Sequence, residues 1–125
     1  MLFAACGPQI GGLPAQIPAG KAAGRAVNTL QPIVGMGVAI GRDSRGVFAL
    51  SLFCTHVGCD MSVDGSVSES GIDCFCHNSL FDSQGNVVRG PANSPLSHFV
   101  VTDDAQGNLT IHTDQPTASS TRLLA

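Results

Sequence analysis

The chain has 125 residues, a length that allows one small domain with extended ends but no separate catalytic domain. Hydrophobic residues make up 43% and charged residues only 12%, which is enough apolar side chain for a core and too little charge for a disordered chain. Six Lys plus Arg stand against nine Asp plus Glu, and the net charge of -3 gives no basic surface for a phosphate backbone, so no nucleic-acid partner is expected.

Residues 1–28 are rich in Gly, Ala and Pro and nearly free of charge, a composition that predicts a flexible linker. Small residues precede Cys6 there, as they do at the cleavage site of a bacterial lipoprotein signal. We interpret this segment as the stump of such a signal with Cys6 as the lipidation site; a spare thiol in a disordered end is the alternative. No apolar run reaches the roughly 18 to 20 residues that span a bilayer, so contact with a membrane is expected only through that lipid.

From residue 29 onward, short apolar runs alternate with Gly, Asp, Asn and Ser, which is the pattern of short strands. The predicted strands are 30–34, 37–40, 47–53, 71–73, 87–89, 97–102 and 109–113. Residues 103–108 have the composition of a tight turn, and no long segment keeps a helical apolar period. The sequence therefore predicts an all-β domain over 29–113 and a disordered tail over 114–125.

Four of the five cysteines lie between residues 54 and 76, in two boxes that also contain two histidines. The boxes read Cys54-Thr55-His56-Val57-Gly58-Cys59 and Cys74-Phe75-Cys76-His77-Asn78-Ser79. Such clustering indicates metal binding, disulfides or both. A tetrahedral zinc site would leave the second cysteine pair unexplained, and two disulfides without metal would leave His56 and His77 without a role.

The two boxes, C-x-H-x-G-C and C-x-C-H-x-S, resemble those of the Rieske iron-sulfur family, in which two histidines replace two cysteines on one iron of a [2Fe-2S] cluster. The resemblance continues through Gly90-Pro91-Ala92 and implies an antiparallel β-sandwich with a small cluster-binding subdomain. It implies one cluster per chain. The site residues that it implies are Cys54 and Cys74 on the inner iron, His56 and His77 on the outer iron, Ser79 as a hydrogen-bond donor to a bridging sulfide, and Cys59 and Cys76 as a disulfide between the loops.

The second box departs from the family pattern in two places. Phe75 replaces the usual Pro and Asn78 replaces the usual Gly; because Asn tolerates a left-handed backbone better than most residues, the loop is expected to keep its shape. Phe81 stands where high-potential members place a Tyr, so the tyrosyl hydrogen bond to a cysteine sulfur is expected to be missing. The phenylalanines are expected in the core, and His98 and His112 are expected to be ordinary surface or strand residues.

The cysteine pair marks, within the resembled family, the high-potential branch of cytochrome bc-type complexes, arsenite oxidase small subunits and small bacterial Rieske proteins. The resemblance thus implies one-electron transfer by an extracytoplasmic carrier, or by the small subunit of an oxidoreductase, on the periplasmic side of a bacterial membrane. The partner would be a cytochrome c or another oxidoreductase subunit. The alternative is the Rieske subunit of a quinol:cytochrome c oxidoreductase, which would take an electron and a proton from quinol at an exposed ligand histidine. No nucleophile with a base, phosphate-binding loop or second cofactor motif is visible.

Overall fold

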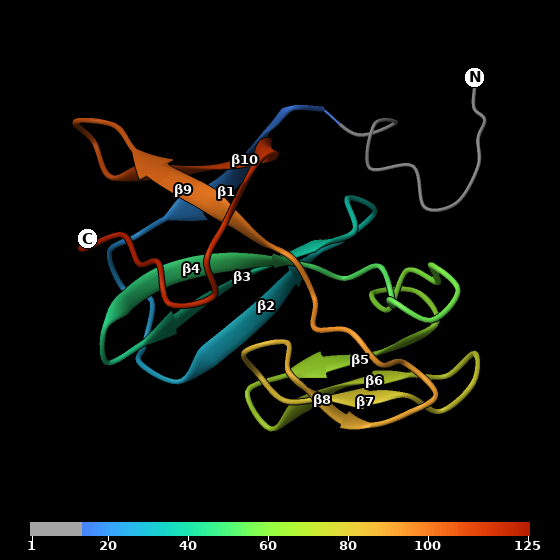
Figure 1. The fold of residues 1–125 in the computed structure, drawn as a ribbon. Helices are drawn as coiled ribbons and strands as arrows, with labels where there is room; N and C mark the ends of the chain where they lie inside the picture. The colour runs from blue at the N-terminus through green and yellow to red at the C-terminus, as the bar shows by residue number, and fades with distance from the viewer. Residues whose placement is uncertain (1–13) are drawn as a thin grey trace.

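The computed structural model describes residues 14–125, which fold into ten strands and no helix (Figure 1). The strands form two antiparallel sheets. The large sheet, in the order β1-β10-β9-β4-β3-β2, consists of β1(Gln16–Lys21), β10(Asn108–Thr117), β9(His98–Asp103), β4(Gly46–Ser51), β3(Val38–Asp43) and β2(Thr29–Ile33). The small sheet consists of β5(Gly65–Ser68), β6(Gly71–Cys74), β7(Leu80–Phe81) and β8(Val87–Arg89). The predicted all-β class is confirmed.

The strand β4 is buried on both faces because it separates two apolar clusters. Successive side chains of a strand point to opposite faces. Val47 and Ala49 join the cluster that β1, β3, β9 and β10 enclose, while Phe48 and Leu50 join the cluster between the two sheets. The second cluster also contains Cys54 and Cys74, so the cysteine boxes begin inside the core. Burial of β4 therefore places the start of the first box, and burial of Cys74 at the end of β6 places the start of the second.

The predicted flexible linker over residues 1–28 is wrong for its second half. Residues 1–13 lie outside the described part of the chain, and Cys6 with them, but Gln16–Lys21 forms β1 at the edge of the large sheet. Ile17 and Ala19 alternate into the core, and the strand pairs with β10. Pro18 is tolerated there because an edge strand leaves one side unpaired. The Gly, Ala and Pro content concealed this alternation.

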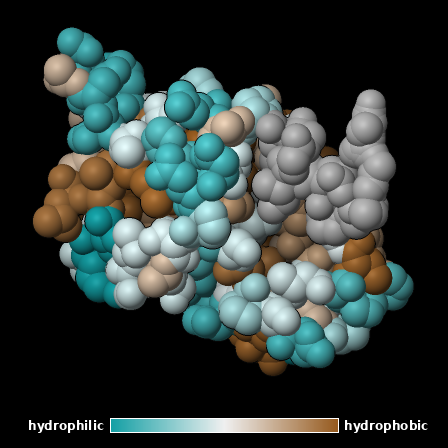
Figure 2. Space-filling model, turned by 45° about the horizontal axis from the view of Figure 1, so that its top comes forward, coloured by the Kyte–Doolittle hydropathy of each residue, from teal (hydrophilic) through white to brown (hydrophobic). Residues whose placement is uncertain are grey.

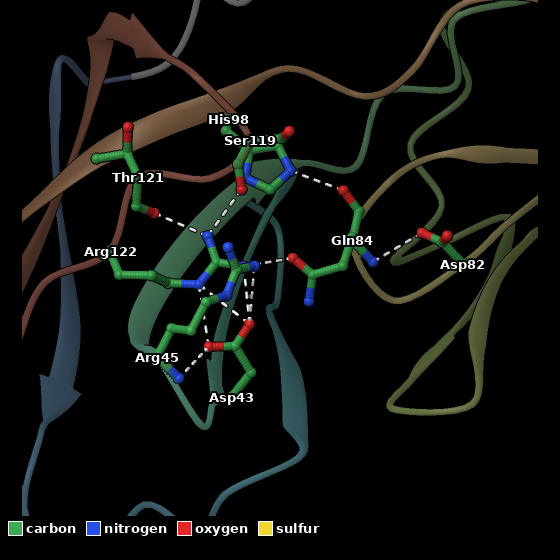
Figure 3. Close-up of polar contacts among 8 residues, drawn as sticks. All are labelled: Asp43, Arg45, Asp82, Gln84, His98, Ser119, Thr121 and Arg122. Carbon is green, nitrogen blue, oxygen red and sulfur yellow. Dashed lines mark hydrogen bonds and ion pairs between the residues drawn. The ribbon is translucent and has the colours of Figure 1, made fainter.

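The predicted disordered tail over 114–125 is also wrong. Strand β10 continues to Thr117, and Leu123 forms a two-residue antiparallel bridge with Val47. Arg122, with only 4% of its side chain exposed, donates hydrogen bonds to both carboxylate oxygens of Asp43 and to the side-chain oxygen of Gln84 (Figure 3). Its guanidinium also lies 4.4 Å from the ring centre of Phe48. This segment therefore connects the large sheet to the loop between β7 and β8.

Hydrophobic surface occurs as separate patches among hydrophilic residues on the face that Figure 2 shows. Within residues 14–125 the exposed large hydrophobic side chains are Val27, Val34, Val57, Val63, Phe75, Val88 and Leu124. No helix in this part of the chain has the length and apolar character needed to cross a membrane.

Candidate metal centre

The two cysteine boxes form loops of the same construction. The first box follows β4, and the N–H of Cys54 donates to the carbonyl of Cys59 at 2.9 Å. The second box joins β6 to β7, and the N–H of Cys74 donates to the carbonyl of Ser79 at 2.8 Å. Each loop is therefore closed at its base by one backbone hydrogen bond, and each begins with a cysteine that the core holds.

The thiols of Cys54 and Cys74 are both free and buried. Burial raises the pKa of Cys74, and the neighbouring Cys54 raises it further, while the backbone N–H groups of Cys76 and His77 oppose the rise by donating to its sulfur. A thiol with a raised pKa ionises when a metal ion coordinates it. The site thus places two adjacent potential thiolates at the inner ends of the loops.

The imidazoles of His56 and His77 lie at the outer side of the same loops, and both are exposed. Their ring centres are 4.8 Å apart, with the ring planes at 88° to each other. Two side chains twenty-one positions apart in the chain meet here because the loops approach each other. The arrangement separates buried sulfur donors from exposed nitrogen donors.

The predicted disulfide between Cys59 and Cys76 is confirmed. It joins the end of the first loop to the middle of the second and closes a sequence separation of 17 residues. The sulfurs of Cys59, Cys74 and Cys76 lie within 4.8 Å of one another, but only Cys74 among them keeps a free thiol. The disulfide therefore lies directly beside the candidate ligand without supplying a ligand itself.

A third segment, residues 90–96, forms hydrogen bonds with both loops. The buried hydroxyl of Ser79 accepts a hydrogen bond from the N–H of Ala92 at 2.9 Å, which leaves the hydroxyl proton free to donate. The hydroxyl of Thr55 donates to the carbonyl of Ser94 at 2.6 Å. Thr55 was not singled out in the sequence, because one threonine inside a box carries no signal of its own.

The two substitutions in the second box have different outcomes. Asn78 has φ 66, so it adopts the left-handed conformation that the sequence led us to expect. Phe75 was predicted in the core but is 62% exposed, because it lies in the loop between β6 and β7, where no strand of residues 14–125 covers it. Arg89 donates through Nε to the carbonyl of Asn78 at 2.9 Å and supports the loop from β8.

The residues present fit a two-iron centre. Two buried thiols and two exposed imidazoles come from two loops, and the loops are joined by a disulfide and closed by a third segment. A single four-coordinate zinc ion would also accept two Cys and two His. The family comparison separates these two interpretations.

Residues 14–100 match the Rieske [2Fe-2S] domain family. A cytochrome b6-f complex iron-sulfur subunit of Cyanothece sp. is 44% identical over 61 residues, which is 47% of this chain and 33% of that protein. A chain in the complex of reduced oxygenase and oxidized ferredoxin in carbazole 1,9a-dioxygenase superposes with a TM-score of 0.56 at 21% identity, over 83% of this chain and 98% of that chain. The Sphingomonas yanoikuyae B1 ferredoxin gives a TM-score of 0.51 at 22% identity, over 78% and 97%. The chain spans about a third of the length of the curated relatives that it matches.

Proposed function

The chain belongs to the Rieske [2Fe-2S] domain family, whose cluster transfers single electrons, and from that premise we propose that it is an extracytoplasmic electron-transfer domain acting on a redox protein partner. The observation that carries the proposal is the separation of the donor groups. Buried thiols lie on the inner side of the two loops, and exposed imidazoles lie on the outer side. Electrons would therefore enter and leave at the imidazole side.

In this proposal Cys54 and Cys74 hold one iron, and His56 and His77 hold the other. When bound, the cluster takes up and releases one electron. The chain's own residues keep the thiols dry and the loops rigid, because the disulfide and the hydrogen bonds from Thr55 and to Ser79 limit their movement. Ser79, completely buried, keeps its hydroxyl proton for a sulfur acceptor. These contacts would allow an electron to be transferred without a large rearrangement of the two loops.

The disulfide supports a location outside the cytosol, because reducing conditions in the cytosol disfavour structural disulfides. Anchorage by a lipid at Cys6, on the periplasmic side of a bacterial membrane, is part of the same proposal. Fractionation of the native cell with mass spectrometry of the residue tests it. An unmodified Cys6 in the soluble periplasmic fraction would contradict the anchor and leave the electron-transfer proposal standing.

The exit route can be tested with two valines of matched exposure. Val57 lies between His56 and Gly58 in the first loop and is 53% exposed, whereas Val27 lies between β1 and β2 and is 54% exposed. Reduced holoprotein is mixed with ferricytochrome c in a stopped-flow instrument, and the second-order oxidation rate is measured. Val57→Asp places a charge at the imidazole side and should change the rate severalfold, whereas Val27→Asp should leave it unchanged. Equal rates in both variants would contradict electron exit at the imidazole side.

A second function is favoured by the named relatives, which are subunits of a cytochrome b6-f complex. Here the domain would belong to a quinol-oxidising complex, with an exposed imidazole that accepts the quinol hydrogen. A quinol oxidation assay on native membranes, before and after depletion of this protein, distinguishes the two. Loss of quinol oxidation on depletion supports the complex subunit, and unchanged oxidation supports the carrier.

A further inference from the structure

Half of the basic side chains in this chain have no acidic partner among residues 14–125. All six lie within residues 14–125. Arg45 and Arg122 pair with Asp43, and Arg89 pairs with Asp73. Within the described residues, Lys21, Arg25 and Arg42 have no carboxylate at salt-bridge distance. In a chain with nine acidic residues, three cations left without carboxylates form a feature that needs a physical reason.

The three unpaired cations gather around one short segment, residues 19–26. Arg25 donates through Nη2 to the carbonyl of Ala19 at 3.1 Å, and Arg42 donates through Nη2 to the carbonyl of Ala22 at 3.2 Å. Lys21 ends β1 and donates to the carbonyl of Gln106 at 3.1 Å. Burial lowers the pKa of Arg25, and the charge of Arg42 lowers it further, so the two guanidinium groups repel each other.

Both guanidinium groups keep much of their hydrogen-bonding capacity unused. A guanidinium carries five N–H donors. Within residues 14–125, Arg25 donates to Gln31 and Ala19, and Arg42 donates to Ala22 alone. The Nε atoms of both residues are buried and have no hydrogen-bond partner in the described part of the chain. Arg122 shows the contrast, since Asp43, Gln84, Ser119 and Thr121 all accept from it.

A polar hollow of about 310 Å³ opens beside these groups. We call it the basic hollow; its lining residues are Lys21, Ala23, Gly24, Arg25, Ala26, Thr29 and Gln31. The lining contains two cations and no carboxylate, and the N–H groups of Ala23, Gly24 and Ala26 have no hydrogen-bond acceptor within the described chain. Lys21 also faces Asp104, whose pKa is lowered by hydrogen bonds from Asn108 and further by Lys21.

We propose that the basic hollow binds an oxoanion of the phosphate class, either free phosphate or the phosphate of a lipid headgroup. Lys21 and Arg25 would donate to the anion, and Arg42 would add its charge from the adjacent strand. Arginine and lysine side chains donate charge-assisted hydrogen bonds to phosphate, and unpaired backbone N–H groups add further donors. An anion here would relieve the repulsion between Arg25 and Arg42. The proposal does not depend on the electron-transfer function.

The test titrates inorganic phosphate into the holoprotein by calorimetry, with chloride adjusted to keep the ionic strength constant. The wild type should show saturable binding of one phosphate per chain. Arg25→Gln should weaken it by about tenfold, the loss expected for one charge-assisted hydrogen bond, and Lys21→Gln should weaken it by a smaller factor. Arg45→Gln removes the same charge from an exposed turn and should leave binding unchanged.

A second arm measures co-sedimentation with phosphatidylglycerol vesicles against phosphatidylcholine vesicles. Binding of free phosphate that depends on Arg25 assigns the site to a soluble anion. Vesicle binding that depends on Arg25, without saturable phosphate binding, assigns it to a headgroup. Absence of both, or equal binding by Arg25→Gln and Arg45→Gln, overturns the proposal. The visible absorbance of the cluster shows whether each variant is folded. If Arg25→Gln does not fold, Arg25→Lys replaces it in the test, because this variant keeps the charge but loses the planar guanidinium.

Discussion

The two ends of the small sheet are held by different chemistry. At the end that carries the cysteine boxes, a disulfide joins two loops whose tips are exposed, and one backbone hydrogen bond closes each loop at its base. At the opposite end, the loop between β7 and β8 is held by buried charge, through Arg122, Asp43 and Gln84 (Figure 3).

This difference follows from the solvent exposure of each end. Exposed ion pairs contribute little, because water and salt screen them, so an exposed pair of loops needs a covalent link. A buried Arg-Asp pair depends on good geometry and on further hydrogen bonds to satisfy its remaining donors. Arg122 has these in Gln84 and in the carbonyls of Ser119 and Thr121. The two ends should therefore respond differently to mutation and to pH.

The largest expected effect is loss of the metal centre. Cys74→Ala should abolish the visible absorbance of the purified protein and the EPR signal of the reduced state, because one buried thiolate ligand is removed. Cys6→Ser, which changes a cysteine outside both boxes, should keep both signals. A fully coloured Cys74→Ala protein would show that Cys74 is not a ligand.

The next effect concerns the opposite end of the sheet. Arg122→Met leaves Asp43 without its main partner and should cost about 3 to 5 kcal/mol of unfolding free energy, the loss typical when one member of a buried ion pair is removed. Urea unfolding of the holoprotein measures it. Asp43→Asn combined with Arg122→Met should recover part of the loss, since no buried charge then remains uncompensated and Arg45, which also loses its partner, is exposed. A loss below about 1 kcal/mol in the single variant would mean that the pair acts as a surface ion pair.

This ion pair also has a pH dependence. Hydrogen bonds from Arg122 hold the pKa of Asp43 well below its usual range, and Arg45 adds to this. The stabilisation is therefore complete above about pH 4, where the carboxyl of the unfolded chain is ionised, and it decreases as the pH falls toward the folded-state pKa. The wild type should lose stability below about pH 4 more steeply than the double variant.

The disulfide should contribute less than the buried pair. Changing both Cys59 and Cys76 to Ala should lower the unfolding free energy by about 3 kcal/mol, as chain entropy predicts for a loop of similar length. The half-life of the visible absorbance on dilution into chelator should shorten too, because the loops can then separate. An unchanged half-life would show that the segment 90–96 alone keeps the two loops together.

The same contrast explains which features could be predicted from the sequence. The metal end is recognisable from local spacing, since each box contains its own candidate ligands. The family resemblance that this spacing supports implied the disulfide, and the tolerance of Asn for a left-handed backbone predicted the conformation of Asn78. The opposite end brings together Asp43, Gln84 and Arg122, which are distant in the chain and belong to no motif. Its residues become recognisable only when the sheets are packed.

In the terminal segments local composition predicted the wrong structure. Residues 16–21 contain Pro and Gly, yet Ile17 and Ala19 alternate toward the core, and pairing with β10 stabilises the strand. The strand β7 consists of only Leu80 and Phe81, too few residues for any periodic pattern. His98 was expected to be an ordinary surface or strand residue, but it is buried in β9 and stacks on Phe48. In each of these places tertiary packing, and not the local sequence pattern, determines the structure.

The smallest expected effect comes from His98, which contacts the loop between β7 and β8 at the same end of the small sheet as Arg122. Its Nε2 shares a hydrogen bond of 2.7 Å with the carbonyl of Gln84, so this nitrogen carries the proton, and Nδ1 is buried without a partner in residues 14–125. Burial lowers the pKa of His98, and the charge of Arg122 lowers it further, against the hydrogen bond to Gln84 and the charge of Asp82.

Because the folded-state pKa of His98 is lowered, the unfolded chain takes up the proton first as the pH falls below about 6.5. The unfolding free energy should therefore decrease from about pH 6.5 downward and level off once the folded-state pKa is passed. Urea midpoints of the wild type and of His98→Gln between pH 8 and pH 5 measure this, and any pH dependence of the metal centre is common to both proteins. His112→Gln, at the other histidine of the large sheet, is the matched control for the loss of a strand imidazole. If wild type and His98→Gln lose stability in parallel, His98 does not link this end of the small sheet to pH, and Asp43 alone carries its pH response.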